Sequence, residues 1–234
     1  MTQNLVGLTA AVLLVSGCGF GMVATGETRR ETVTIALDKA ERVRTEIRME
    51  AGELRVKSGS PKLVDATFSY NVDEWKPVVD YRVTGSDGEL NILQPRGSRA
   101  GFGNTVYEWE LDLNADVPLE LVANLGAGEV NLELGRMNLS RVEVNIGAGE
   151  VDMDLRGEPR RDYSVHIRGG VGETKVRLPR GARIEATAAK GLGEINVEGL
   201  ERRGNVWTNP DPADTSVTVR VDVKGGIGEI NLIR

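Results

Sequence analysis

The chain has 234 residues, of which 40% are hydrophobic, so it can bury a sizeable core in one large or two small domains. Its 29 basic and 35 acidic residues give a net charge of −6, and no run of Lys or Arg exceeds two residues, which argues against nucleic-acid binding. One cysteine excludes a disulfide within the chain, and one histidine excludes a zinc site of the usual His/Cys type.

The N-terminus is predicted to be an export signal followed by a lipid anchor. The apolar run from Leu5 to Val15 spans 11 residues, too short to cross a bilayer of about 30 Å but typical of a signal-peptide core. The following "VSGC" resembles a bacterial lipobox, which predicts removal of residues 1–17 as a signal peptide and acylation of Cys18. The first residues, "MTQNL", lack the basic side chain expected of such a signal, so an ordinary apolar segment with an incidental cysteine is the alternative.

This anchor predicts a location in the bacterial cell envelope. Because Gly19 and not Asp follows the cysteine, we expect the outer membrane in a host with two membranes. In a host with a single membrane, we expect the outer face of the cytoplasmic membrane. Residues 18–30 are predicted to form a polar, glycine-containing tether.

Ordered structure is predicted from Glu31 onward, and it is all-β. Helical periodicity is almost absent, and short runs alternate apolar and polar residues, as in "VTIAL", "ELRVK", "YEWELDL" and "SVTVRVDV". Residues 31–117 are expected to form an N-terminal β-rich cap or subdomain, with weak echoes of a repeat at Gly52-Glu53-Leu54 and Gly88-Glu89-Leu90.

A Gly-x-Gly-Glu motif organises residues 118–234, which are predicted to form a C-terminal β-solenoid. Its glutamates are separated by 21, 23, 21 and 35 residues, and a period near 21 fits one coil of a solenoid. The longer last interval is predicted to contain a loop anchored by Trp207. The five glutamates are Glu129, Glu150, Glu173, Glu194 and Glu229.

Alternation along each strand predicts which way the motif faces. The residues one and three positions after each glutamate are mostly apolar, such as Val130 and Leu132, and are expected to point inward. The glutamates then lie on the outer face. If strand geometry continues backward, both glycines also lie outside, and the residue between them points to the core. These expected core residues are Ala127, Ala148, Val171, Leu192 and Ile227.

The outward carboxylates form the first candidate surface, for a ligand or a cation. At a spacing of about 4.8 Å, like charges repel by about 0.9 kcal/mol per pair in water. Solvent and basic neighbours are the expected relief, and a bound calcium ion is the sharper alternative. Since the glycine- and aspartate-rich repeat of calcium-binding solenoids is absent, no metal and no other cofactor is predicted. The surface consists of Glu129, Glu150, Asp152, Glu173 and Glu194.

The outward glycines form the second candidate surface, a packing strip for the N-terminal subdomain, a second copy or an envelope polymer. The alternative is that glycine serves tight bends between short strands. The strip consists of Gly126, Gly128, Gly147 and Gly149.

Catalytic motifs are not apparent. The glycine-rich segments lack the Lys-Ser/Thr and the following helix of a phosphate-binding loop. The single histidine, His166, alternates with Val165 and Ile167 and is therefore expected on the outer face. A paired-carboxylate site acting on glycosidic bonds is the enzymatic alternative.

Both halves of the sequence carry stretches typical of one known family. They are "ERVRTEIRMEAGELRVKSGS", "LVDATFSYN" and "EWKPVVDY" in the N-terminal part, the repeats "GAGEVNL", "GAGEVDM" and "GLGEINV", and the ending "GNVWTNPDPADTSVTVRVDVKGGIGEINLI". In these, the chain resembles the bacterial toast-rack family of secreted or lipid-anchored proteins. The resemblance implies a right-handed single-stranded β-helix, related to domains described as putative adhesins and to the C-terminal domain of LiaF-type envelope-stress regulators. It implies no established enzymatic activity and no catalytic residues.

The predicted function is therefore that of a non-catalytic cell-envelope lipoprotein that acts as a binding, adhesion or stress-sensing module. Its expected partners are the membrane, through the lipid anchor, and an envelope protein or polysaccharide. The alternatives are an enzyme acting on envelope polysaccharide through surface carboxylates and an accessory to an envelope-stress signalling system. An enzyme would need aromatic platforms for sugars, for which the tryptophans are Trp75, Trp109 and Trp207.

Overall fold

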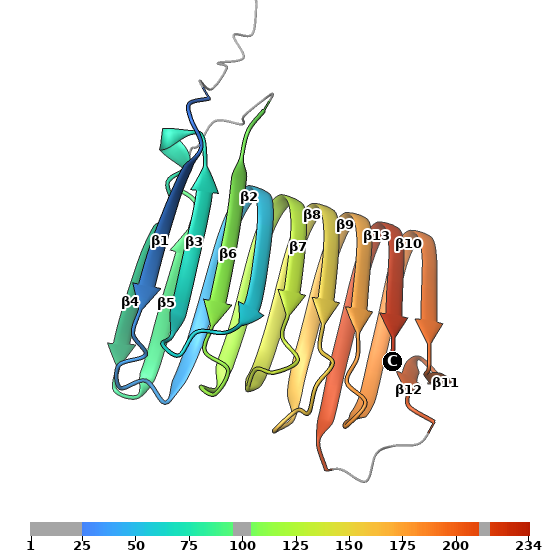
Figure 1. The fold of residues 1–234 in the computed structure, drawn as a ribbon. Coiled ribbons are helices and arrows are strands. Elements are labelled where there is room, and N and C mark those ends of the chain that lie inside the picture. The colour runs from blue at the N-terminus through green and yellow to red at the C-terminus, as the bar shows by residue number, and fades with distance from the viewer. Residues whose placement is uncertain (1–24, 96–103, 211–215) are drawn as a thin grey trace, which may run out of the picture.

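A single open sheet carries nearly all the secondary structure of the chain. The structure is a computed structural model and describes residues 25–95, 104–210 and 216–234, so the predicted signal peptide and Cys18 lie outside the described residues. The prediction of an all-β protein is confirmed, since 13 strands join in one sheet (Figure 1). Helix in the described ranges is limited to one 3-10 turn, η1 (Asp73–Trp75), which has neither the length nor the hydrophobicity of a membrane span.

The strands fall into a short set and a long set. The N-terminal part contains the short strands β1 (Arg29–Ile35), β3 (Val64–Tyr70), β4 (Val78–Thr84), β5 (Asp87–Leu93) and β6 (Tyr107–Leu113), and one long strand, β2 (Arg42–Ser58). The long strands that follow are β7 (Leu119–Glu133), β8 (Leu139–Asp154), β9 (Tyr163–Arg177), β10 (Arg183–Glu198) and β13 (Thr218–Ile233). Between the last two lie the short strands β11 (Glu201–Arg203) and β12 (Val206–Thr208).

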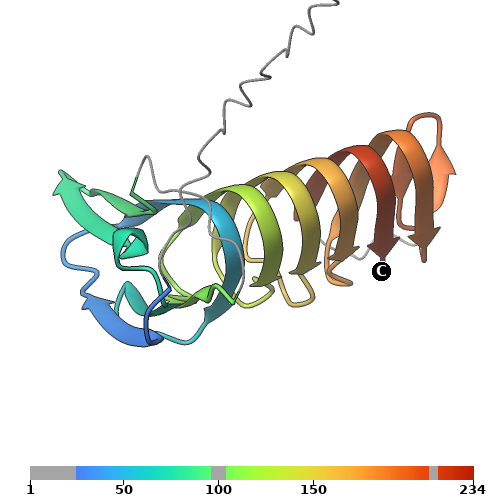
Figure 2. The same ribbon diagram turned by 90° about the horizontal axis from the view of Figure 1, so that it is seen from above.

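Each long strand bends back on itself near its middle and so forms one coil. In the view from above, the bent strands wrap around a common interior (Figure 2). Neighbouring coils pair in parallel with the glycine motifs in register, Gly128 opposite Gly149 and Gly149 opposite Gly172. The motifs therefore lie at the bends, which line one edge of the molecule (Figure 1). We call this the glycine edge.

The last two coils are stacked out of chain order. The order of the strands is β9, β13, β10, so the final strand of the chain lies between two earlier strands. Val171 is opposite Ile227, and Ile227 is opposite Leu192. The segment between β10 and β13, where a loop was predicted, therefore leads the chain back to the position between β9 and β10. Part of this segment forms the β11–β12 hairpin beside β10. As a result, both sides of the C-terminal strand are hydrogen-bonded.

The N-terminal part continues the same sheet. β2 pairs in parallel with β7, from Val43 opposite Leu119 to Lys57 opposite Glu133. On its other side, β2 pairs first with β5 and then with β6, and β6 continues to β3 and β1. The pairing of β2 with β7 joins the parts before and after residue 118 into one sheet, and the division into two domains at that point stays a prediction.

An aromatic cluster fills the interior of the N-terminal part. Trp109 packs edge-to-face on Phe68 and Tyr107, with ring centroids 5.4 and 5.5 Å apart, and Tyr107 packs on Trp75 at 5.2 Å. Tyr107 also donates a hydrogen bond from its hydroxyl to the carbonyl oxygen of Trp75 at 2.7 Å. Two of the three tryptophans are therefore buried in the core and are not available as sugar platforms.

The predicted alternation is confirmed after the motif and wrong within it. Val130 and Leu132 are buried, as expected. The residue between the glycines, however, faces solvent: Val171, Leu192 and Ile227 are 54%, 68% and 53% exposed. The reason is the second glycine of the motif, which has a positive φ in every coil, for example +131° in β7 and +139° in β9. This conformation interrupts the strand geometry and turns the preceding side chain outward.

The first glycine of each motif is required by the neighbouring coil. A Cβ on Gly170 would lie 2.1 Å from the carbonyl oxygen of Gly147, well inside van der Waals contact. Its neighbour Gly169 differs, because a Cβ there would meet only the side chains of Thr174 and Ile146, at 3.8 and 3.9 Å. Two adjacent glycines therefore have opposite tolerance for a side chain.

We expect Gly170→Ala to lower the free energy of unfolding by about 1–3 kcal/mol, because the new methyl group would push two coils apart. Gly169→Ala should be neutral or stabilising by about 0.5 kcal/mol, because it mainly restricts the unfolded chain. Urea denaturation of both variants and the wild type measures the difference. Equal effects of the two substitutions would contradict this account of the stack.

Candidate functional site

The predicted carboxylate surface lies along the strand segments that follow the bend. Glu129 is opposite Glu150, and Glu150 is opposite Glu173, so these three occupy successive coils as expected. Glu194 is not the next member, because β13 lies between β9 and β10 and supplies Glu229. In the order of the stack, the carboxylate column is Glu53, Glu129, Glu150, Glu173, Glu229 and Glu194.

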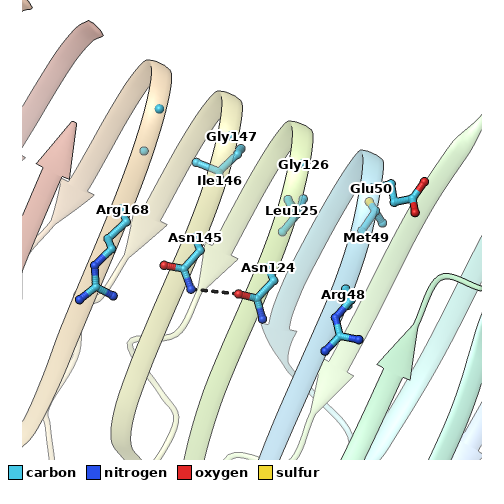
Figure 3. Close-up of a pocket in the computed structure, with 12 residues that line it drawn as sticks. Arg48, Met49, Glu50, Asn124, Leu125, Gly126, Asn145, Ile146, Gly147 and Arg168 are labelled. Carbon is cyan, nitrogen blue, oxygen red and sulfur yellow. Dashed lines mark hydrogen bonds between the residues drawn. The ribbon is translucent and has the colours of Figure 1, made fainter. Parts of the chain in front are cut away.

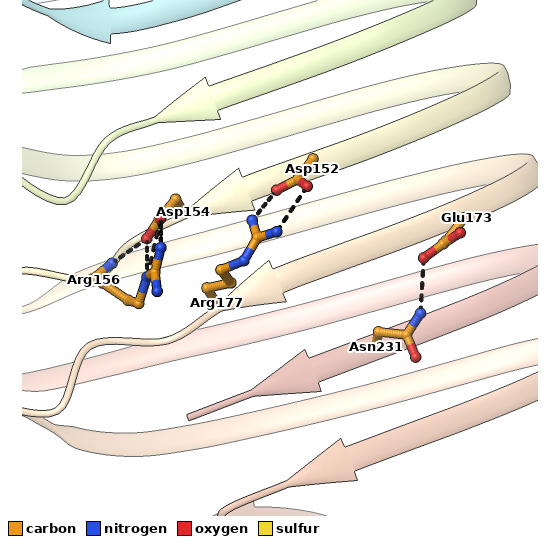
Figure 4. A network of polar contacts seen from close by, with 6 residues as sticks. All are labelled: Asp152, Asp154, Arg156, Glu173, Arg177 and Asn231. Carbon is orange, nitrogen blue, oxygen red and sulfur yellow. Dashed lines mark hydrogen bonds and ion pairs between the residues drawn. The ribbon is translucent and has the colours of Figure 1, made fainter.

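Asparagines relieve part of the repulsion in this column. Asn231 donates from Nδ2 to Oε1 of Glu173 at 2.9 Å (Figure 4), and Asn196 donates to Oε1 of Glu229 at 2.6 Å. Each asparagine lies two residues after the glutamate of its own coil and so shares its face. Glu129 and Glu150 are exposed, and neither side chain has a hydrogen bond or ion pair within the described part of the chain.

Asp152 lies beside the column, opposite Asn131 and Lys175, and Arg177 of the next coil binds its carboxylate. Both Nη atoms of Arg177 donate to it, Nη2 at 3.1 Å (Figure 4). Nearby, Asp154 accepts hydrogen bonds from Arg156, the shortest at 2.6 Å. Across the described ranges, no three His, Cys, Asp or Glu side chains lie close enough together to hold a metal ion.

The glycines of the predicted packing strip lie against the backbone of the neighbouring coil. A Cβ on Gly126 would lie 2.3 Å from the carbonyl oxygen of Glu50, and one on Gly128 would lie 1.9 Å from that of Gly52. The corresponding distances are 2.5 Å for Gly147 and 1.9 Å for Gly149, both to the carbonyl of the preceding coil. These glycines allow the coils to approach at their bends. Their role as a packing strip for another surface stays a prediction.

A shallow trough runs beside the glycine edge, on the strand segments that precede the bend (Figure 3). It was not predicted from the sequence. It crosses four coils and has a volume of about 770 Å³. The missing side chains of the glycines keep it open. Its lining consists of Arg48, Met49, Glu50, Asn124, Leu125, Gly126, Asn145, Ile146, Gly147, Arg168, Gly169 and Gly170.

Four polar side chains form a row along this trough: Arg48, Asn124, Asn145 and Arg168 (Figure 3). Each is opposite the next across the coil boundary. Asn145 donates from Nδ2 to Oδ1 of Asn124 at 2.9 Å, which fixes the orientation of both amides. The N–H groups of Asn124 and the oxygen of Asn145 then remain without a partner among the described residues. We call these four residues the polar row.

Acidic residues hold the two arginines of the polar row in place. Arg48 donates to Glu46 at 2.7 Å, and Arg168 donates to Glu143 at 3.4 Å. Each of these contacts uses one N–H group, so most donors of each guanidinium remain available to a ligand. The row thus offers donors and acceptors in the middle, and at each end an arginine whose charge is partly balanced by a glutamate.

Glu143 supports the middle of the row as well. Its carboxylate accepts hydrogen bonds from Arg141 at 2.9 Å and from Asn145 at 3.2 Å. The hydrogen bond from Arg141, then that from Asn145, followed by the charges of Arg141 and Arg168, lower the pKa of Glu143 below its usual value. The ionised form is therefore the one that the folded protein favours.

The structure shows where the chain belongs among known proteins. One continuous sheet, coiled through bends at repeated glycine motifs, defines a class of β-repeat protein with long in-register columns of side chains. A family model described as the N-terminal domain of toast_rack, DUF2154, matches residues 24–177, more than half of the chain. The chain belongs to the toast-rack family, as its sequence motifs indicate.

Three solved structures are similar to the chain to different degrees. A protein of Clostridium sporogenes ATCC 15579, described as a putative cell adhesion protein, is 32% identical with a TM-score of 0.85, and the match covers 88% of this chain and 99% of that one. Putative adhesins of Parabacteroides distasonis and Parabacteroides merdae are each 13% identical with TM-scores of 0.27, and 87% of this chain aligns with 97% and 96% of theirs. Those two likenesses are too small to carry an argument. No curated protein matches the chain.

These findings suggest a non-enzymatic protein. His166, the single histidine, alternates with the buried Val165 and Ile167 and so lies on the outer face, away from the carboxylate column. The one tryptophan outside the aromatic cluster, Trp207, is half-buried in the β11–β12 hairpin, where the guanidinium of Arg202 lies 5.2 Å from its ring.

We expect Glu143→Gln to reduce the stability of the protein slightly at pH 7, by less than about 1 kcal/mol. Because the folded-state pKa of Glu143 is lowered, its contribution is present above the unfolded pKa of about 4.3 and is lost as the pH falls through the folded value. The difference between variant and wild type should therefore disappear in acid. Free energies of unfolding at pH 7 and at pH 3 or below measure it.

Glu133→Gln is the matched control, because Glu133 is exposed and has no ion pair in the described part of the chain. It should change stability little at either pH. A difference between Glu143→Gln and wild type that persists unchanged in acid would show that the carboxylate charge is not what supports the row.

Proposed function

We propose that this toast-rack protein is a non-catalytic binding and adhesion module of the bacterial cell envelope, and that the polar row binds an envelope polysaccharide. The observation that carries the proposal is the row itself, two fixed amides between two arginines along an open trough. The kinship with a protein described as a putative cell adhesion protein supports the adhesion role.

The chemistry of the row suits a polysaccharide better than a compact metabolite. Sugar hydroxyls both donate and accept hydrogen bonds, and the amides of Asn124 and Asn145 offer both functions. The trough is shallow and extends over four coils, whereas small-molecule sites are usually enclosed. Coils repeat at about 4.8 Å, so an extended polymer lying along the stack would meet equivalent positions in turn. Arg48 and Arg168 add a preference for carboxylate or phosphate groups on that polymer.

The proposal includes the finer features that the sequence and the family resemblance imply. They are a right-handed β-helix with coils of about 21 residues, a signal peptide over residues 1–17, and a tether over residues 18–30 that begins with acylated Cys18. The anchor would hold the protein in the outer membrane of a host with two membranes, and otherwise on the outer face of the cytoplasmic membrane.

The binding surface can be tested by affinity electrophoresis of the full chain in gels that contain polygalacturonate, an acidic polysaccharide, or dextran, a neutral one. We expect polygalacturonate to retard the wild type more strongly than dextran. The double variant Arg48→Ala/Arg168→Ala should weaken the interaction at least tenfold. Asn124→Ala/Asn145→Ala should weaken it by roughly fivefold or more, since each lost hydrogen bond contributes about 1 kcal/mol.

The matched control is Arg55→Ala/Arg136→Ala, which removes the same amount of charge from exposed positions outside the trough. It should bind like the wild type. Loss of binding in the control to the same degree would show that net charge and not the polar row is recognised, and absence of retardation in both gels would contradict the proposal.

The lipid anchor is tested separately. Mass spectrometry of the mature protein purified from membranes should find a chain that begins at Cys18 and carries the added mass of acyl chains. Cys18→Ser should leave the protein with its signal peptide uncleaved and without lipid. An unmodified cysteine in the mature wild type would refute the anchor.

A further inference from the structure

The glycine edge carries an apolar ridge that the polar row and the anchor do not use. Val171, Ile227 and Leu192 lie opposite one another in three adjacent coils. They are 54%, 53% and 68% exposed, and they account for three of the four exposed large hydrophobic residues among the described residues. Single exposed apolar side chains are common, but a contiguous set marks an interaction surface.

The fold itself does not require large side chains at these positions. The coils nearer the N-terminus carry alanine at the equivalent position, Ala51, Ala127 and Ala148, in register with the ridge. Alanine therefore satisfies the geometry of the bend. The ridge residues become large only in the three coils at the C-terminal end of the stack.

The chain enters the fold at the same edge. Arg29, at the start of β1, is opposite Tyr70, which is opposite Tyr107. The carbonyl oxygen of Tyr107 lies 2.4 Å from where a Cβ on Gly52 would be, at the bend of the first coil. The start of β1 thus lies at the glycine edge, at the end of the stack opposite the ridge (Figure 1). The predicted anchor residue, Cys18, precedes Arg29 by 11 residues in the sequence.

We propose that the apolar ridge inserts into the surface of the membrane that holds the lipid anchor. This inference rests on the anchor in the proposed function. The protein would lie with its glycine edge on the bilayer, held by acyl chains at one end of the stack and by Val171, Ile227 and Leu192 at the other.

Basic side chains lie beside the ridge on the strand segments that precede the bend. Arg168, Lys190 and Lys224 are exposed and lie two or three residues before the ridge residues of their coils, within reach of lipid phosphates. Arg168 and Lys224 also contact carboxylates, Glu143 at 3.4 Å and Asp222 at 3.5 Å.

On the other side, the ridge coils carry three glutamates of the column, Glu173, Glu229 and Glu194. Glu173 and Glu229 accept hydrogen bonds from asparagines. The stack would therefore rest on its bends, with the basic side chains at the border of the headgroup layer and both faces of the stack open to water.

The test uses the full chain in vesicles of phosphatidylethanolamine and phosphatidylglycerol, with a fluorophore on an introduced thiol. Leu192→Cys places the label on the ridge. Arg136→Cys places it in the exposed turn between β7 and β8, at the edge opposite the bends. Lipids with a spin label near the headgroup should quench the ridge label at least threefold more than the control label. Val171→Ser/Ile227→Ser in the Leu192→Cys background should reduce that quenching at least twofold, with unchanged circular dichroism.

Each outcome is decisive. Equal exposure of the two labels to water in vesicle-bound protein overturns the membrane contact, as does absence of protein on the vesicles. Energy transfer between labels on two copies, without quenching by lipid, shows that the ridge joins two chains and also overturns it. The mass of the same preparation reports acylation of Cys18, so failure of the anchor is seen independently of failure of the ridge.

Discussion

The close approach of neighbouring coils at their bends is the contact on which the rest of the structure depends. At Gly128, Gly149 and Gly172, a Cβ would lie 1.8 to 1.9 Å from a carbonyl oxygen of the coil before. Glycine at these points lets the backbones stack in parallel without a shift at the bend. Once this register is fixed, any residue type repeated at one position of the motif becomes a column, which is how the glutamates come to lie side by side.

The out-of-order insertion of β13 determines what those columns contain. Glu229 and Ile227 reach their places only because the final strand enters between β9 and β10. Without it, Glu173 would adjoin Glu194, and Val171 would adjoin Leu192, each column being one residue shorter. The insertion also leaves β10 and its hairpin at the end of the sheet, so the C-terminus is held between two partners.

The sequence predicts the strands and their inward faces well, because alternation reports burial directly, as at Val130 and Leu132. It fails at Val171, Leu192 and Ile227, because the positive φ of the following glycine reverses the side-chain direction and leaves no trace in the alternation. It also misses the stacking order, which the repeat period cannot reveal. The polar row had one available signal, the recurrence of Asn-apolar-Gly in "NLGAGE" and "NIGAGE", but its two arginines share no such motif.

The bend divides the surface of the stack into two faces of different chemistry. The polar row, from Arg48 to Arg168, lies on the segments before it, and the carboxylate column lies on the segments after it. An acidic polymer would be repelled by the unpaired carboxylates of the column, whereas the glutamates beside the polar row are paired with arginines. In the proposed orientation the glycine edge rests on the bilayer, and the trough opens beside that edge. A polymer bound along the stack would then run parallel to the membrane plane, so the same edge that positions the protein would hold its ligand close to the lipid surface.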